Sequence, residues 1–282
     1  MASFEECSIR LTGGYAAYGR FFPASDPRGA VLYHHGIQSH CGWYGESAAR
    51  LVEAGYDVLQ YDRRGSGRNP IGRGDAESAQ QLIADAQLAR DELRRRSGFD
   101  RYHVVGVSWG GRLAVTAYID DPTGALSLSL VTPGLFPLRG VSKEVAARIG
   151  FAMLYEPATL FDIPLNRAEL FTAAQQGQRF FRTDELLLRQ ATAGFFLASR
   201  RMDKIIARLS KCDPVPIHLM LAGEEGIIDN EKTEAFAHDL AWPTTKITHY
   251  PGARHSLEVE PCAESYFRDL VGFIACGDIA TR

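Results

Sequence analysis

Short apolar runs alternate with segments of helical spacing along the first half of the chain. Residues 6–11 and 15–22 flank Gly13-Gly14 and predict a β-hairpin. Beyond the hairpin, four apolar runs have the length of buried strands, and helical patterns separate them. The predicted strands are 30–34, 56–60, 102–107 and 126–131, and the predicted helices are 43–54, 78–96 and 110–119. Strands that alternate with helices indicate a parallel sheet that helices cover on both faces.

This alternation stops at Thr132-Pro133-Gly134 and resumes only after about residue 208. Residues 133–208 show helical patterns and loops but no convincing strand. Beyond them the pattern predicts strands at 217–222 and 246–250 and helices at 231–240 and 261–275. We therefore predict an α/β core made of residues 1–132 and 209–282. Residues 133–208 are predicted to form a helical cap, or lid, inserted into that core.

The predicted cap is rich in aromatic residues. It covers about a quarter of the chain but holds 8 of the 15 phenylalanines. Aromatic area outside the sheet either lines an apolar binding surface or forms a small core within the insertion, and the sequence leaves both readings open. Substrate-binding residues are therefore suspected within residues 133–208, without individual assignment.

Composition narrows the class of protein. The chain has 282 residues, 45% of them hydrophobic, which is enough for a large core. Its 31 basic and 34 acidic residues give a net charge of −3, which offers no electrostatic footprint for nucleic acid. Residues 1–10 lack the apolar core of a secretory signal, and no apolar run reaches the roughly 18 residues of a membrane helix. Five scattered cysteines fit no disulfide framework. We expect a cytoplasmic location, no integral membrane segment and no nucleic-acid partner; the oligomeric state is not predicted.

The strongest chemical signal is Gly106-Val107-Ser108-Trp109-Gly110, which lies between a predicted strand and a predicted helix. A serine at such a turn sits in a strained backbone conformation, and the two glycines leave room for close backbone approach. The following helix directs its N-terminus at the site, which favours developing negative charge. This context predicts Ser108 as a nucleophile.

A serine nucleophile needs a base, and the base needs a group that fixes its tautomer. In the nucleophile-elbow arrangement these partners follow the serine in the order acid, then histidine. Four histidines follow Ser108, and three of them fall inside predicted strands or helices: His218, His238 and His249. Only His255 lies in a loop after the last strand, where this arrangement assembles its chemistry. His255 is the predicted general base.

The acid is less well defined by the sequence. The loop after strand 217–222 contains Glu224, Glu225 and Asp229. Glu225 lies at the strand end, whereas Asp229 precedes a helix that it is also suited to cap. We favour Glu225 as the residue that orients His255 and keep Asp229 as the alternative acid. Glu224, or no functional acid, stays open.

Acyl transfer also requires N–H donors for the oxygen that becomes negative. The backbone N–H of Trp109, directly after the nucleophile, is one predicted donor. The loop His35-Gly36-Ile37-Gln38 follows the strand at 30–34, and its glycine permits close approach to the serine. The Ile37 N–H is the second predicted oxyanion-hole donor.

Two segments superficially suggest cofactors. His34, His35, His40 and Cys41 match no compact metal-ligand spacing, so no metal site is predicted. Residues 61–68 contain two glycines but lack the lysine of a phosphate-binding loop and the full glycine set of a dinucleotide loop. In that loop, Asp62 and Arg64 are expected to make charge-assisted hydrogen bonds to neighbouring segments. No cofactor is predicted.

Taken together, four motifs resemble the α/β-hydrolase superfamily, and within it the monoacylglycerol lipase and lysophospholipase-like branch. They are His35-Gly36-Ile37-Gln38-Ser39-His40 with Trp43-Tyr44, Asp62-Arg63-Arg64-Gly65-Ser66-Gly67, Gly106-Val107-Ser108-Trp109-Gly110-Gly111, and Gly252-Ala253-Arg254-His255. The resemblance implies a mostly parallel eight-stranded sheet with a helical cap after strand six. It also implies hydrolysis of carboxylic esters through an acyl-serine intermediate, without a cofactor. That branch usually has aspartate where this chain has Glu225.

Several functions remain compatible with these motifs. The first is a serine esterase or lipase acting on single-chain lipid esters such as monoacylglycerols or lysophospholipids. The same machinery also serves thioesterases, lactonases, carbon–carbon hydrolases and acyltransferases, because fold does not set function. Dehalogenases and soluble epoxide hydrolases of this fold use an aspartate nucleophile, so Ser108 argues against both. The last alternative is a non-catalytic ligand-binding relative, which the unusual acid alone supports.

Overall fold

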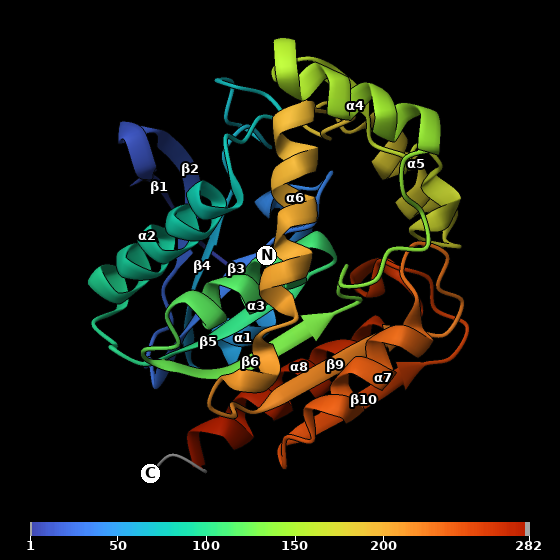
Figure 1. Ribbon diagram of the computed structural model, residues 1–282. Helices are drawn as coiled ribbons and strands as arrows, with labels where there is room; N and C mark the ends of the chain where they lie inside the picture. The colour runs from blue at the N-terminus through green and yellow to red at the C-terminus, as the bar shows by residue number, and fades with distance from the viewer. Residues whose placement is uncertain (1, 280–282) are drawn as a thin grey trace.

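A computed structural model describes residues 2–279 of the chain, and its centre is an eight-stranded sheet (Figure 1). The strand order is β1-β2-β4-β3-β5-β6-β9-β10. Strand β2 pairs antiparallel with both β1 and β4, and all other neighbouring strands are parallel. The strands span Glu5–Arg10 (β1), Ala16–Phe22 (β2), Gly29–His34 (β3), Tyr56–Tyr61 (β4), Tyr102–Val107 (β5), Ala125–Val131 (β6), Ile217–Ala222 (β9) and Thr245–Tyr250 (β10).

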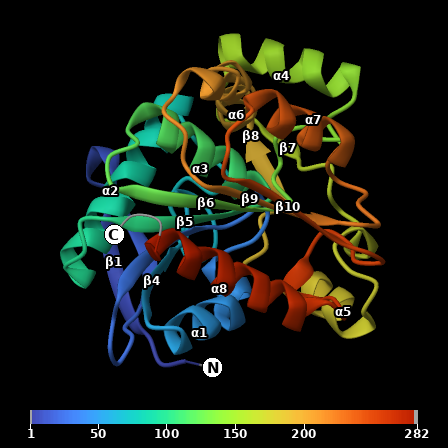
Figure 2. The ribbon, with the colours of Figure 1, turned by 90° about the horizontal axis from the view of Figure 1, so that it is seen from below.

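Helices cover both faces of this sheet, as predicted. Figure 2 shows α1 and α8 on one face and α2, α3 and α7 on the other. Their bounds are Gly45–Glu53 (α1), Ala79–Ser97 (α2), Trp109–Asp120 (α3), Asn230–Leu240 (α7) and Ala263–Ile279 (α8). A 3-10 turn, Cys41–Tyr44, replaces the beginning of the helix predicted at 43–54. None of the helices described between residues 2 and 279 is long and apolar enough to cross a bilayer.

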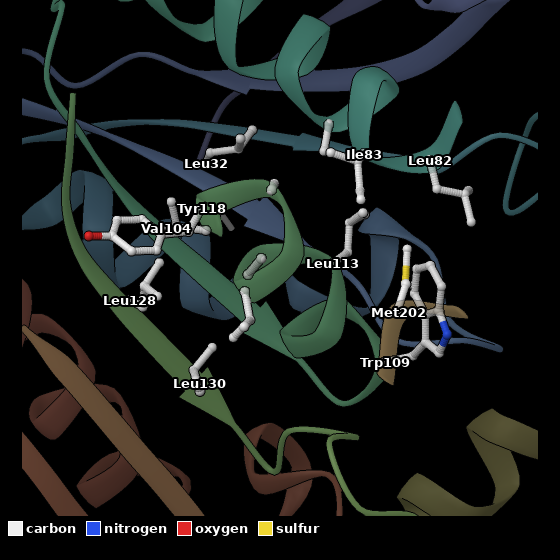
Figure 3. Packing of buried hydrophobic residues seen from close by; sticks show 14 of the residues in the cluster. Leu32, Leu82, Ile83, Val104, Trp109, Leu113, Tyr118, Leu128, Leu130 and Met202 are labelled. Atoms are coloured by element: carbon white, nitrogen blue, oxygen red, sulfur yellow. The ribbon is translucent and has the colours of Figure 1, made fainter. Parts of the chain in front are cut away.

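The central strands β3, β4 and β5 are buried along their whole length and consist mostly of apolar residues, because helices cover both of their faces. Figure 3 shows one of the two resulting cores, where Tyr118 of α3 packs beside Val104 of β5 and Leu128 of β6. At the N-terminal end of α3, Trp109 lies beside Met202. This second contact joins the sheet core to the segment that follows β6.

That segment, between β6 and β9, contains three helices that stand beyond the sheet (Figure 1). They are α4 (Lys143–Tyr155), α5 (Gln175–Thr183) and α6 (Ala193–Ile206). The expectation of no strand here was wrong, because β7 (Leu160–Asp162) and β8 (Gln190–Thr192) form a two-stranded antiparallel sheet. Each has only three residues, too few for an alternating pattern to stand out from the sequence.

Four short 3-10 turns complete the described elements outside the 41–44 turn. They are Thr12–Gly14 (η1), Ala168–Leu170 (η3), Leu209–Lys211 (η4) and Leu257–Val259 (η5). The first closes the predicted hairpin between β1 and β2, and the last follows the loop that carries His255. The predicted fold, a mostly parallel eight-stranded sheet with helices on both faces, is confirmed.

Candidate active site

The turn at Ser108 joins the end of β5 to the beginning of α3. Ser108 has φ 53° and ψ −122°, a conformation that costs a non-glycine residue of order 1–3 kcal/mol. Its carbonyl oxygen accepts hydrogen bonds from the N–H groups of Gly111 (2.9 Å) and Gly134 (2.7 Å), which hold the strained turn in place. The strand places the serine at the carboxyl edge of the sheet, as the sequence predicts.

The glycines around Ser108 are required by close backbone contacts. A Cβ on Gly106 would lie 2.7 Å from the carbonyl oxygen of Gly110, and a Cβ on Gly110 would overlap the carbonyl oxygen of His34. Backbone atoms cannot rotate away as a flexible side chain can. The spacing of glycine two residues before and after Ser108 therefore follows from the packing of β5, α3 and β3.

The structure brings His255 to Ser108. His255 lies in the loop after β10, its side chain is 3% exposed, and its Nε2 is 2.8 Å from the Oγ of Ser108. The Oγ1 of Thr132, the residue directly after β6, donates to the carbonyl oxygen of His255 at 3.0 Å. Thr132 has φ 39° and is fully buried. A strained residue at the end of β6 therefore holds the loop after β10 that carries His255.

Of the three candidate acids, Glu225 contacts His255. Its two carboxylate oxygens lie 2.9 and 3.1 Å from Nδ1 of the imidazole. A carboxylate only accepts hydrogen bonds, so Nδ1 carries the proton and Nε2 is free to accept the proton of Ser108. The Oε1 of Glu225 also accepts from the backbone N–H of Ile227 at 2.8 Å, which fixes the carboxylate in this orientation.

The other two acids lie elsewhere. Asp229 caps α7, accepting from the backbone N–H of Lys232 at 3.0 Å and pairing with its ammonium at 2.8 Å. These contacts with Lys232 lower the pKa of Asp229. Glu224 is exposed and pairs loosely with Arg254 at 3.7 Å. Each carboxylate of the loop therefore has a different partner, and Glu225 is the one that contacts the imidazole.

The loop 35–38 lies against the nucleophile. A Cβ on Gly36 would be 3.3 Å from the Cβ of Ser108, so no larger residue fits here without displacement. Trp109 begins α3, where backbone N–H groups have no partner within the helix. The two N–H groups predicted as oxyanion donors, those of Ile37 and Trp109, thus belong to segments that flank Ser108.

A comparison with known protein families gives the relationship of the chain. The model of the Hydrolase_4 family, described as serine aminopeptidase, S33, matches residues 25–262. The chain belongs to this family. The matched range includes Ser108, Glu225 and His255 of this S33-family hydrolase.

Curated relatives share only part of their length with this S33-family member. Proline iminopeptidase of Xanthomonas citri is 30% identical over 178 residues, 60% of this chain and 53% of the relative. Rhodomycin D methylesterase DnrP of Streptomyces peucetius is 28% identical over 225 residues, 73% of this chain and 65% of the relative. The chain thus spans about half or less of the first curated relatives that it matches.

Solved structures resemble the chain over nearly its full length. The monoacylglycerol lipase of Paleococcus ferrophilus superposes with a TM-score of 0.83 at 19% identity, covering 93% of this chain and 99% of the lipase. A thermostable carboxyl esterase from Bacillus coagulans superposes with a TM-score of 0.84 at 16% identity, covering 99% of each chain. These similarities confirm the α/β-hydrolase fold, and the resemblance noted from the motifs agrees with them.

The phenylalanines of residues 133–208 have two kinds of packing partner. Phe161 packs inside the insertion with Ile149 and Ala152. By contrast, the rings of Phe171 and Phe181 pack against Trp43 of the 41–44 turn, and Phe171 lies edge-on to His255 with 6.0 Å between centroids. One aromatic ring of residues 133–208, that of Phe171, therefore packs against His255.

Residues 34–41 and 61–68, the segments that superficially suggested cofactors, contact other parts of the chain. Burial lowers the pKa of His34 to about 3, and His34 contacts the hydroxyl of Tyr61. His40 bonds through Nε2 to Asp184 of the insertion at 3.1 Å. Among residues 2–279, no three His, Cys, Asp or Glu side chains gather in a group that could hold a metal ion. As expected, Asp62 and Arg64 tie their loop to neighbours: Asp62 accepts from the Cys41 N–H, and Arg64 pairs with Asp85.

Three residues beside the site were not anticipated. The pattern marks Thr132 only as the end of the strand–helix alternation, it favours Arg64 over Arg63 for the contacts of their loop, and it gives no indication of Asp184. Asp184 accepts from the indole N–H of Trp43 at 2.6 Å as well as from His40. For Arg63 the position carries a partial signal, because the residue lies two positions after β4, whose six residues are all buried. The partners of Asp184 lie more than 140 positions away and leave no local signal.

Proposed function

We propose that this chain is a serine hydrolase that cleaves carboxylic esters through an acyl-serine intermediate. The observation that carries the proposal is the continuous hydrogen-bonded series Ser108–His255–Glu225, with heavy-atom distances of 2.8 and 2.9 Å. In this series Ser108 is the nucleophile, His255 the general base and Glu225 the residue that orients and stabilises the imidazolium.

The reaction proceeds by two acyl transfers. The Oγ of Ser108 bonds to the ester carbonyl carbon while its proton moves to Nε2 of His255, and the carbonyl electrons move to the oxygen. The N–H groups of Ile37 and Trp109 stabilise this oxyanion. The carbon–oxygen bond to the alcohol then breaks, and the leaving alcohol takes the proton from Nε2, which leaves acyl-Ser108. Water repeats the sequence: its oxygen bonds to the acyl carbon, its proton passes through His255, and Ser108 is regenerated.

We further infer that residues 133–208 cap the site and that the substrate carries a single acyl chain. Phe171 packs against His255 and, with Phe181 and Trp43, forms an apolar cluster beside the site; apolar side chains of this kind line sites that bind hydrocarbon. The fold neighbours named as monoacylglycerol lipases support the same reading.

The family description and the proline iminopeptidase relatives raise peptide hydrolysis as a second candidate. An aminopeptidase needs an unpaired acid to hold the substrate's amine. Near His255, however, Glu260 accepts from the backbone N–H of Arg254 and Glu224 pairs with the Arg254 side chain. Glu260 is thus bound to the backbone, whereas Glu224 is exposed and loosely paired, so the choice between a neutral ester and a charged amine rests on a measurement of turnover.

A substrate panel tests the proposal. Turnover is measured on p-nitrophenyl esters of short to long acyl chains, a monoacylglycerol, an acyl-CoA and prolyl p-nitroanilide. We expect turnover of the esters, with long chains preferred, and its loss in Ser108→Ala. The matched control is Ser256→Ala, which removes the neighbouring hydroxyl of the histidine loop and should keep full turnover. Faster cleavage of the prolyl anilide than of any ester would overturn the assignment.

A further inference from the structure

Arg63 is a buried cation beside the nucleophile. It follows β4 at position 63, is 3% exposed, and burial lowers the pKa of its guanidinium to about 10. No acidic side chain among the described residues forms an ion pair with it; the carboxylate of the adjacent Asp62 accepts from the backbone N–H groups of Cys41 and Arg68 instead. Burial of an unpaired cation is costly. The hydrogen bonds and ring contacts of the Arg63 guanidinium must therefore offset the cost of its burial.

Those contacts are with the loop 35–38. The Nη1 of Arg63 donates to the carbonyl oxygen of Gly36 at 3.3 Å, and its Nη2 donates to that of Ile37 at 3.1 Å. The guanidinium also lies 4.5 Å from the ring centroid of Trp109. One side chain therefore contacts both residues whose N–H groups are the proposed oxyanion donors.

His35 reinforces the contact with the Gly36 carbonyl. Its Nδ1 lies 2.8 Å from that oxygen, and its Nε2 accepts from the backbone N–H of Arg63 at 2.9 Å. Burial and the charge of Arg63 hold the pKa of His35 well below its usual range, so the imidazole is neutral with the proton on Nδ1. The Gly36 oxygen thus has two donors on the same peptide.

In a trans peptide, the C=O of one residue and the N–H of the next point in opposite directions. The described residues contain no cis peptide bond. Donors fixed on the Gly36 oxygen therefore fix the direction of the Ile37 N–H. A cationic donor on the oxygen also polarises the peptide, which strengthens the N–H as a donor to an anion.

We propose that Arg63 is a positioning residue for the oxyanion hole: together with His35 it sets the plane of the Gly36–Ile37 peptide and directs the Ile37 N–H at the substrate carbonyl oxygen. This inference rests on the proposed ester hydrolysis. It places the effect of Arg63 in the transition state, where the oxygen is anionic, and not in ground-state substrate binding.

The test compares Arg63→Met with Arg64→Met. Both variants remove a guanidinium from the same loop, but Arg64 pairs with Asp85, away from the loop 35–38. Active sites are counted by fluorophosphonate titration, so that kcat refers to folded enzyme. Since loss of one oxyanion donor costs about 10²–10³ in kcat, we expect Arg63→Met to lower kcat about 100-fold with KM changed less than about threefold. Arg64→Met should lower the melting temperature but keep kcat per active site.

A transition-state mimic separates positioning from general structural damage. A trifluoromethyl ketone forms an anionic adduct with a serine nucleophile, and its inhibition constant should rise in Arg63→Met by the same factor as kcat/KM falls. Arg63→Lys, which restores charge but not the two-point contact, should give an intermediate value. Unchanged kcat per active site in Arg63→Met, or an unchanged inhibition constant, would overturn the inference. Absence of ester turnover in the parent chain would instead refute the proposed function.

Discussion

Replacement of Glu225 by glutamine is predicted to disable the site by changing the tautomer of His255. In the parent chain, Oε1 of Glu225 accepts from the Ile227 N–H at 2.8 Å, and both oxygens face Nδ1 of His255. A glutamine has one oxygen and one NH₂ group. The fixed N–H of Ile227 selects the oxygen for the Oε1 position, which turns the NH₂ group toward Nδ1.

An NH₂ group only donates, so Nδ1 must then accept and the imidazole proton moves to Nε2. In that tautomer Nε2 no longer accepts the proton of Ser108. The equivalent carboxylate-to-amide change in a serine protease lowers kcat about 10⁴-fold with little change of geometry, and we expect Glu225→Gln to lower kcat by about the same factor. The fold should persist, because the amide is isosteric and keeps the contact to Ile227.

The matched control is Asp229→Asn, the same chemical change four residues along. Asparagine caps helices as well as aspartate does, so both stability and kcat should stay close to those of the parent. The assay is kcat per titrated active site on a p-nitrophenyl ester, with thermal unfolding of each variant. Loss of activity in Asp229→Asn together with retained activity in Glu225→Gln would refute the assignment of the acid.

Three further predictions concern stability. Gly110→Ala should destabilise the fold by about 3 kcal/mol in urea titrations, because its Cβ would overlap the His34 carbonyl oxygen. Gly45→Ala, with open space around the added Cβ, should leave the stability close to that of the parent. Equal effects of the two substitutions would contradict this packing. Burial holds the pKa of His34 at about 3 and that of His218 at about 4, below the value of 6.5 in the unfolded chain. The unfolded chain therefore binds more protons, and the free energy of unfolding should fall as the pH decreases from 6.5 toward 4. The loss is up to about 1.4 kcal/mol per pH unit for each histidine. Calorimetry across that range should show a shallower decline in His218→Gln, and an unchanged slope would argue against a neutral buried His218. Asp184→Ala leaves two N–H donors of the sheet domain without an acceptor and should cost about 1–3 kcal/mol in the same urea titrations, and a stability equal to the parent's would contradict that role.

Local pattern and chain order were sufficient to predict much of the fold and the candidate site. The central sheet strands are bounded by turns and have both faces buried, so their mostly apolar runs mark them to within a residue or two. Ser108 is recognisable because the strained turn needs glycines at fixed positions beside it. His255 follows from chain order and from its place after the last strand. The cytoplasmic location stays a prediction.

What the sequence could not reveal depends on contacts between distant segments. The choice between Glu225 and Asp229 turns on which carboxylate reaches Nδ1 of His255, and both lie in one short loop. Arg63 contacts a loop 26 and 27 positions away, and that contact depends on the order of strands β4 and β3 in the sheet. Strands β7 and β8 pair across nearly 30 residues with three residues each, too short to carry a pattern.

The central claim is that the hydroxyl of Ser108 is activated by His255. The most direct measurement is the reaction of the intact chain with a fluorophosphonate, followed by mass spectrometry of the modified peptide. We predict one equivalent of label, on Ser108 alone, at a rate that falls by orders of magnitude in His255→Gln. Failure of the folded chain to react, or label carried by another residue, would contradict the account.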